Sequence, residues 1–378
     1  MAPGSGIANG NITINPLGDN NTVTLVGGNL FLREDVDNTS TFATVTLNTN
    51  DIVVNGNATI TVDRTGANTG ESAKLVLVKS LTIGGETLTT AQGSSYRLGV
   101  AGKTTMTGSS TFSLGADMVF SGGITDNGAG LAVIKTGTAT LWFNDTTSDF
   151  TGPLVINQGA VRFGNSSTAS TSATIGQATR VIVNPGGSIQ LQAAANVANA
   201  KIEVHSSGSF AGSVVLNSAF DPKSLITSDS SGLLLLGATF STALDMSLIG
   251  DGTFQLGTTG AFTYSAGTLG VGAVNPLTGV NVYRLGGNAQ NLTITAANAN
   301  VLTGDNQVQI GSLLSAGGTV LFNNTNNYNG RHRRLPRDGG DHLVGWGEHR
   351  ARQRAGGCVR HADGGDSQWQ LPQRGWHG

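Results

Sequence analysis

The sequence has very little cysteine and little charge. Cys358 is the single cysteine among 378 residues, which excludes a framework of intrachain disulfides. Charged residues make up 12% of the chain, about half of the ~25% usual in globular domains. No apolar run approaches the ~18 residues of a membrane helix, and the start of the chain has neither the basic nor the apolar region of a signal peptide. We therefore expect any export signal to lie upstream of this chain.

What the chain has instead is glycine and short alternating segments. Glycine accounts for 56 of 378 residues, about twice the typical ~7%. Apolar and polar residues alternate in segments such as 11–15, 44–48, 59–63 and 201–205, each bounded by Gly, Asn or Asp. This pattern is typical of short, half-buried strands. Helical periodicity is confined to the alanine-rich segment from Leu191 to Ala200, so the sequence predicts an all-β fold.

A second pattern, Gly-x-apolar-x-apolar, recurs along the chain. It begins at Gly159, Gly187, Gly252, Gly267 and Gly318, with a partial copy at 208–210. The first spacings are 28, 21 and 44 residues, and the last equals two steps of about 22. Periods of this size indicate a solenoid, in which each coil covers the apolar edge of the next. The pattern predicts a β-solenoid; the alternative is a β-sandwich with glycine turns.

The segment 122–163 resembles the passenger-associated transport repeat of bacterial autotransporters. The family's repeat contains Leu-x-Lys-x-Gly-x-Gly-Thr-Leu-x-Leu, an Asn/Thr segment ending in Tyr-Thr-Gly, and a final Gly-x-Leu. Residues 131–143 follow the first part with Ala139 in place of a Gly, and residues 144–152 follow the second with Phe150 in place of the Tyr. A second copy covers about 314–330. The motif positions are Lys135, Gly137, Leu141, Phe150, Gly152, Gly159, Gly318, Tyr328 and Gly330.

The resemblance implies a right-handed parallel β-helix over residues 1–330, exposed on the surface of a Gram-negative bacterium. In the family, the repeat is thought to assist passenger transport and folding, and it contains no catalytic residues. The resemblance therefore implies a structural or adhesin-like surface protein. Its partners would be host or matrix polysaccharide or protein, or other cells. We expect the outer-membrane translocation barrel and the anchor of such a passenger to lie outside this chain.

The composition changes abruptly after Gly330. Residues 331–378 hold 9 of the 21 Lys and Arg residues, 5 of the 6 His and 3 of the 4 Trp, and the strand alternation stops in the middle of the second motif. We interpret 331–378 as a non-native, frame-shifted basic tail, because a one-nucleotide shift in GC-rich codons permits the missing half of the repeat. Having few apolar residues to bury, this tail is expected to be disordered.

The alternative for the tail is a genuine basic segment that contacts nucleic acid or an anionic surface. A nucleic-acid patch favours sustained Lys and Arg with few acidic residues. Here five acidic residues interrupt the basic ones: Asp338, Asp341, Glu348, Asp363 and Asp366. The sequence therefore predicts no nucleic-acid partner.

Some β-helical proteins are polysaccharide lyases or hydrolases, and this is the alternative function. Glycoside hydrolysis needs two carboxylates about 5–10 Å apart, for which Asp126, Asp145 and Asp149 are the candidates. Asp145 and Asp149 lie in an Asn/Thr/Ser run that we interpret as a solvated turn. Lys135 and Arg162, the nearest bases, are expected to point outward from alternating strands. The sequence therefore predicts no catalytic residue.

Metal and cofactor sites are not expected either. His205 is the one histidine in residues 1–330, and it is interpreted as a surface residue that closes a strand. His349, Cys358 and His361 have ligand chemistry, but a frame shift would make their spacing a coincidence. Calcium nonapeptides, phosphate loops and dinucleotide fingerprints do not occur in the sequence.

Overall fold

The computed structural model describes residues 12–13, 17–18, 20–33, 44–64, 74–164, 169–197, 200–295, 300–312, 314–323, 325–330 and 332–334. The chain divides into two units, residues 1–341 and 342–378, and the second unit lies wholly outside the described residues. The predicted frame shift of the tail, and its predicted disorder beyond residue 334, therefore stay predictions.

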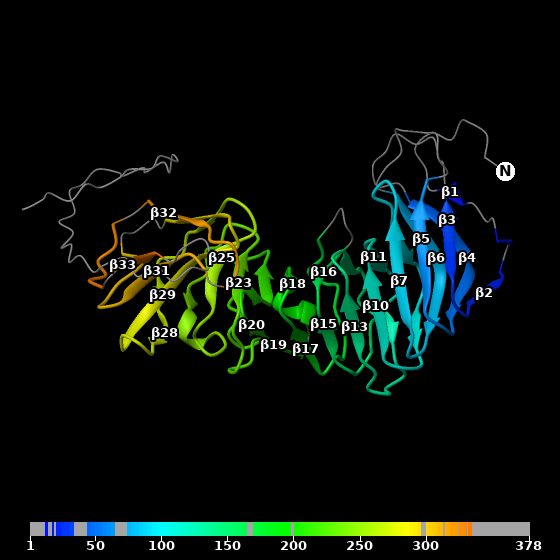
Figure 1. Cartoon of the computed structure of the whole chain (residues 1–378), viewed down its shortest axis with the longest axis horizontal. Coiled ribbons are helices and arrows are strands. Elements are labelled where there is room, and N and C mark those ends of the chain that lie inside the picture. Colours follow the sequence, from blue (N-terminus) through cyan, green and yellow to red (C-terminus); the bar gives the residue numbers. More distant parts are fainter. Residues whose placement is uncertain are drawn as a thin grey trace, which may run out of the picture. The chain divides into compact units, whose positions relative to one another are not determined.

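The described residues form stacked β-coils, with parallel pairing from one coil to the next (Figure 1). An 18-stranded sheet contains β1 (Ile12–Thr13), β2 (Thr22–Leu25), β4 (Thr44–Val54), β6 (Leu75–Ile83), β8 (Arg97–Val100), β9 (Thr104–Met106), β11 (Met118–Phe120), β12 (Ile124–Thr125), β14 (Thr140–Phe143), β16 (Gly159–Phe163), β18 (Gly187–Leu191), β22 (Ser213–Leu216), β23 (Leu233–Leu236), β25 (Gln255–Thr258), β28 (Gly272–Asn275), β29 (Val280–Gly287), β31 (Gln307–Ile310) and β33 (His332–Arg334).

A second, eight-stranded sheet accompanies the first over the N-terminal coils. It contains β3 (Asn29–Arg33), β5 (Ala58–Asp63), β7 (Thr87–Gln92), β10 (Ser110–Leu114), β13 (Val133–Thr136), β15 (Leu154–Ile156), β17 (Arg180–Val183) and β19 (Lys201–Val204). Figure 1 shows β7, β10, β13, β15 and β17 side by side in sequence order.

Smaller sheets replace the eight-stranded sheet towards the C-terminal end of the described chain. They contain β26 (Phe262–Tyr264), β30 (Asn291–Ile294) and β32 (Thr319–Phe322); β24 (Leu244–Asp245) and β27 (Leu269–Gly270); and the hairpin of β20 (Ser206–Ser207) and β21 (Phe210–Ala211). Two 3-10 turns, η1 (Ala194–Val197) and η2 (Met246–Leu248), are the only helical elements in the described ranges. Where the sequence suggested helical periodicity, over 191–200, β18 ends and η1 follows.

The all-β prediction and the parallel β-helix are confirmed, and the β-sandwich alternative is wrong. Among the named strands that the structure describes, antiparallel pairing occurs only between β20 and β21 and between β28 and β29. Parallel pairing of successive coils lets alternate residues point into one shared interior. This interior is a single hydrophobic core cluster that draws side chains from both large sheets.

The inner rows of side chains follow the register of the strands. In the eight-stranded sheet, Phe112 of β10 pairs with Lys135 of β13, which pairs with Ile156 of β15. In the 18-stranded sheet, Phe120, Phe143 and Phe163 occupy matching positions of β11, β14 and β16. Their ring centroids are 5.9 and 6.0 Å apart, so aromatic side chains fill the interior of these coils.

The parallel ladder extends past the predicted domain boundary at residue 330. β33 pairs with β31 through the partners Val308–His332 and Ile310–Arg334. The first residues after the composition change therefore still occupy a coil position.

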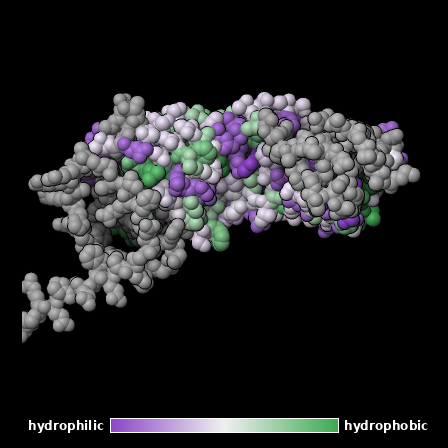
Figure 2. All heavy atoms as spheres, turned by 90° about the horizontal axis from the view of Figure 1, so that it is seen from above, coloured by the Kyte–Doolittle hydropathy of each residue, from purple (hydrophilic) through white to green (hydrophobic). Residues whose placement is uncertain are grey.

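The outer surface is mostly polar, as the alternation predicts. On the face drawn in Figure 2, most of the coloured surface is hydrophilic or weakly polar, and hydrophobic residues form small patches. The structure contains no helix, among the residues it describes, with the length and apolar content needed to cross a membrane.

Candidate functional site

The first motif copy forms the turns between β13, β14, β15 and β16. Gly137 and Gly159 adopt φ values of +75° and +71°, in the left-handed region that glycine enters without strain. A Cβ at Gly152 would overlap the carbonyl oxygen of Leu131 in the preceding coil. These glycines let neighbouring coils approach closely at their corners.

The apolar motif residues point into the core. Leu141 and Phe150 are both fully buried. The ring of Phe150 stacks against that of Phe143 with centroids 6.3 Å apart. The segment from Asn144 to Thr151 therefore covers the same hydrophobic core as the two sheets.

Lys135 does not point outward as predicted. It shares the inner face of β13 with Val133 and is fully buried. Its ammonium donates hydrogen bonds to the carbonyl oxygens of Thr136, Gly137 and Gln158, at 2.9, 2.6 and 3.0 Å. Burial lowers its pKa to about 8, against the opposing attraction of Asp117. Because side chains alternate with period 2, the inward Val133 fixes Lys135 inward too.

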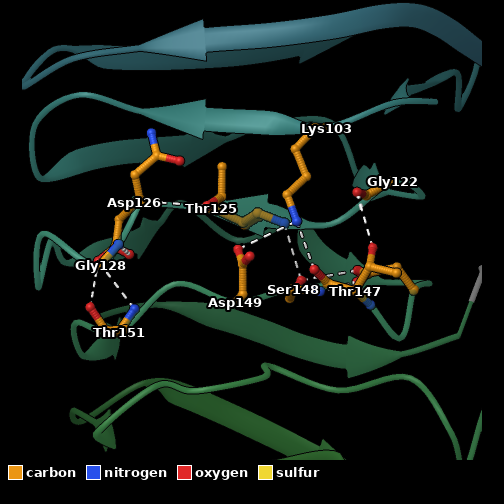
Figure 3. Close-up of polar contacts among 12 residues, drawn as sticks. Lys103, Gly122, Thr125, Asp126, Gly128, Thr147, Ser148, Asp149 and Thr151 are labelled. Atoms are coloured by element: carbon orange, nitrogen blue, oxygen red, sulfur yellow. Dashed lines mark hydrogen bonds and ion pairs between the residues drawn. The ribbon is translucent and has the colours of Figure 1, made fainter.

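Asp126 holds the turn that follows β12 (Figure 3). Its carboxylate accepts hydrogen bonds from the backbone N–H groups of Gly128, Leu131 and Thr151, at 3.0, 2.9 and 3.1 Å, and from the Thr151 hydroxyl at 3.0 Å. Burial pushes the pKa of Asp126 upward, but these four bonds outweigh it, and the pKa lies below its ordinary value. This carboxylate therefore ties two successive coils together.

Asp145 makes a second turn of the same kind. Its carboxylate accepts from the backbone N–H groups of Thr147 and Ser148, at 2.8 and 2.7 Å, and from the Ser148 hydroxyl at 3.1 Å. The predicted turn is present, but it is not solvated at this residue, because Asp145 is only 7% exposed. Burial raises the pKa of Asp145 against the pull of these hydrogen bonds.

Asp149 lies on the surface beside Lys103, which belongs to the second coil before it (Figure 3). The Lys103 ammonium is 3.4 Å from Asp149 Oδ1 and donates to the carbonyl oxygen of Thr147 at 2.7 Å. A half-exposed ion pair of this kind contributes little stability in water. The three candidate carboxylates thus bind within the fold, two to turn N–H groups and one to a lysine.

The outer face of the 18-stranded sheet carries a cluster that the sequence did not reveal. Trp142 Nε1 donates to Asp117 Oδ2 at 3.3 Å, and the Arg162 guanidinium lies 5.3 Å from the Trp142 ring centroid. Arg162 points outward, as predicted, and burial lowers its pKa against the attraction of Asp117. The signal that could have found this cluster is the coil spacing, since Trp142 and Arg162 are register partners.

A cavity of about 420 Å³ lies over β24 and β27. It is lined by two carboxylates, Asp221 and Asp245, and by Lys223. Lys223 is 3.0 Å from Asp221 Oδ2, and Asp245 Oδ1 accepts from the backbone and hydroxyl of Ser247. None of the predicted carboxylate candidates lines this cavity.

The second motif copy is placed differently from the first. β14 of the first copy belongs to the 18-stranded sheet, whereas β32, which follows Gly318, belongs to the three-stranded sheet. A Cβ at Gly330 would overlap the Asn306 carbonyl oxygen, so its turn is as close as that at Gly152. Tyr328 is half-buried against the core, where Phe150 is fully buried.

The described residues contain no group of three or more His, Cys, Asp or Glu side chains with the placement of a metal site. His205 follows β19, as predicted, and its Nε2 lies 3.2 Å from Glu203 Oε1. The ligand candidates His349, Cys358 and His361 lie outside the described residues.

Comparison of the chain with protein-family models, with curated protein sequences and with solved structures gives no match. The resemblance to the transport repeat therefore stays an expectation drawn from the motif alone.

Proposed function

We propose that this chain is a non-catalytic, surface-exposed segment of an autotransporter-type passenger, with a structural or adhesin-like role. In this role the stacked coils carry loops and hairpins away from the cell, and the transport-repeat motif forms closed, well-packed coils. Its partners would be matrix or host polysaccharide or protein, or other cells.

One observation supports the proposal above the others: the Asp126 and Asp145 carboxylates are bound by backbone and hydroxyl groups of the turns around them, and Asp126 also by Thr151 of the next coil. Glycoside hydrolysis needs one carboxyl group to protonate the substrate and a second to act as base or nucleophile across a shared space. Here seven hydrogen bonds, four to Asp126 and three to Asp145, hold the carboxylates to the chain. Such residues serve folding rather than acid–base chemistry.

Protease accessibility on intact cells tests the location. Proteinase K added to intact cells of the source organism is expected to remove the protein, as followed with an antibody to residues 74–330, while a periplasmic control protein stays intact. Protection of the protein until the cells are lysed would contradict the proposal.

A direct assay separates the enzymatic alternative. The purified chain is incubated with neutral and acidic polysaccharides, and new reducing ends or unsaturated sugars are measured. We expect none. Turnover that disappears in Asp221→Asn or Asp245→Asn, the two carboxylates that line the cavity over β24 and β27, with each variant still folded by circular dichroism, would make the chain an enzyme.

A further inference from the structure

The outer face of β23 is apolar. β23 consists of four leucines, of which Leu234 and Leu236 point into the core. Leu233 and Leu235 point the opposite way, yet they are only 5% and 4% exposed. With Val215 of the neighbouring β22 they form a separate hydrophobic cluster outside the main core.

Two surface segments rise beside this cluster and leave a cleft between them. On one side stands the hairpin β20–β21, which interrupts the regular coil after β19. On the other lie residues 311–312 and 314–318 between β31 and β32, from which Leu314 packs onto the cluster. The cleft encloses about 510 Å³, within the range of small-molecule sites in proteins. Its floor is the outer face of β18, β22 and β23.

The polar groups that line the cleft carry no charge. They are the hydroxyls of five serines and the amide of Asn288, and among the described residues no Asp, Glu, Lys, Arg or His lines the cleft. A charged ligand placed here would give up water without meeting a counter-charge, which is unfavourable. An uncharged ligand that offers hydroxyl groups meets no such penalty.

An exposed aromatic ring completes the site. Phe210, on β21, is 67% exposed and lines the cleft. Ser188 of β18 and Ser213 of β22 are register partners in adjacent coils. Both line the floor of the cleft. Within the part of the chain that the structure describes, neither serine hydroxyl takes part in a hydrogen bond. Both are therefore available to a ligand.

We propose that this cleft binds an uncharged saccharide unit of a glycan. A sugar ring has an apolar C–H face, which packs on Phe210, and a rim of hydroxyls, which exchange hydrogen bonds with Ser188 and Ser213. The apolar surface with a few placed polar groups is the usual composition of a ligand site. The inference supplies a ligand class for the adhesive role and to that extent rests on the proposed function.

Binding of the full chain to defined glycans tests the inference. The probes are three neutral polysaccharides, laminarin, dextran and soluble starch, with alginate as an acidic counterpart, measured by affinity electrophoresis and isothermal titration calorimetry. We expect at least one neutral glycan to bind and alginate not to compete for the same site. Binding of none of the three, or preferred binding of alginate, overturns the inference.

Phe210→Ala is the decisive variant, with Leu277→Ala as its matched control. Leu277 is 86% exposed and lies on the other hairpin, between β28 and β29, away from the cleft lining. Phe210→Ala is expected to weaken glycan binding about tenfold without changing the melting curve, whereas Leu277→Ala binds as the unaltered chain does. Equal binding by both variants overturns the site. Binding of a neutral aliphatic probe, such as decanol, that none of the glycans displaces would make the cleft an apolar-ligand site instead.

The outcomes also separate this inference from the proposed function. Surface exposure on intact cells without glycan binding rejects the cleft ligand alone. Glycan binding by a protein that proteinase K does not reach on intact cells rejects the passenger role and leaves the binding site in place.

Discussion

The coils from β7 to β19 and the coils from β22 to β32 share one sequence pattern but differ in regularity. In the first region, the eight-stranded sheet runs unbroken from β7 to β19 beside the 18-stranded sheet. In the second region, the accompanying strands fall into sheets of three and two strands, and the register shifts between Leu256 and Gly257. Gly-x-apolar-x-apolar therefore specifies a strand and its inner face, but not the sheet that the strand joins.

The connections between strands also differ between the two regions. In the first motif copy, β13 leads through the tight turn at Gly137 into β14, and the longer side 144–153 returns to β15. In the second region, the hairpin β28–β29 lies between β27 and the next coil. The 18-stranded sheet continues past this hairpin through β25, β29 and β31, whereas β32 of the second copy pairs with β30 of the three-stranded sheet.

The largest expected difference between the regions concerns their aromatic core residues. Phe143 is fully buried and contacts the rings of Phe120, Phe150 and Phe163, so Phe143→Ala is expected to cost about 3–5 kcal/mol. Phe322, at the matching motif position of the second copy, is half-buried, and Phe322→Ala is expected to cost less than about 2 kcal/mol. Urea unfolding followed by circular dichroism, with hydrogen exchange to localise the effect, measures both. Equal losses would mean that the two regions are packed alike.

The corner glycines give a smaller effect. Alanine at Gly152 must displace the backbone of Leu131, which is held between coils on both sides, and we expect a loss of about 1–3 kcal/mol. Gly330→Ala meets the backbone of Asn306 in the same way. In the described part of the chain, however, no strand pairs with the far side of β32 or β33, so the last coil is free to shift and the loss is smaller.

Gly267→Ala is the control for both glycine variants, since a Cβ there meets no atom within 4 Å and its backbone is not left-handed. Its unfolding curve is expected to match that of the unaltered chain. A loss at Gly267 as large as that at Gly152 would show that glycine content, rather than close approach between coils, decides stability.

The sequence predicts the inner positions well where two independent signals agree. The alternation and the motif both require a buried side chain at Leu141 and a turn at Gly159. The structure has Leu141 fully buried and Gly159 in a left-handed turn conformation. The prediction that Lys135 points outward was wrong. It followed from the charge of the side chain, whereas the period-2 alternation of its strand places the side chain in the interior. Three carbonyl oxygens meet its ammonium there, and their positions depend on turns in two coils that the sequence does not specify.

The candidate site was beyond prediction for a related reason. The cleft over β23 needs Phe210, Leu233 and Leu314 to meet, and these residues come from a hairpin, a strand and a loop of different coils. Period-2 alternation also does not distinguish a parallel from an antiparallel partner, so the hairpins read as ordinary strands. The exposed Phe210 was visible only as a partial copy of the repeat pattern.

The smallest expected effect is the pH dependence that Lys135 gives to the first region. Its pKa is about 8 in the folded protein and 10.5 as an ordinary lysine, so the folded state holds this proton less tightly. Below pH 8 both states are protonated and the cost of the buried charge is fully present. Between about pH 8 and 10.5 the unfolded state binds more protons, and stability therefore rises with pH.

Lys135→Met isolates this contribution, because it keeps the length of the side chain and removes the charge. The free energy of unfolding of the unaltered chain is expected to rise by on the order of 1 kcal/mol relative to the variant between about pH 8 and 9, where the folded state loses this proton and the unfolded state keeps it. The motif position that corresponds to Lys135 in the second copy is Leu314, which lies on the outer face and has no charge to titrate. Parallel pH profiles for the unaltered chain and Lys135→Met would place the ammonium in contact with water and remove this difference between the two regions.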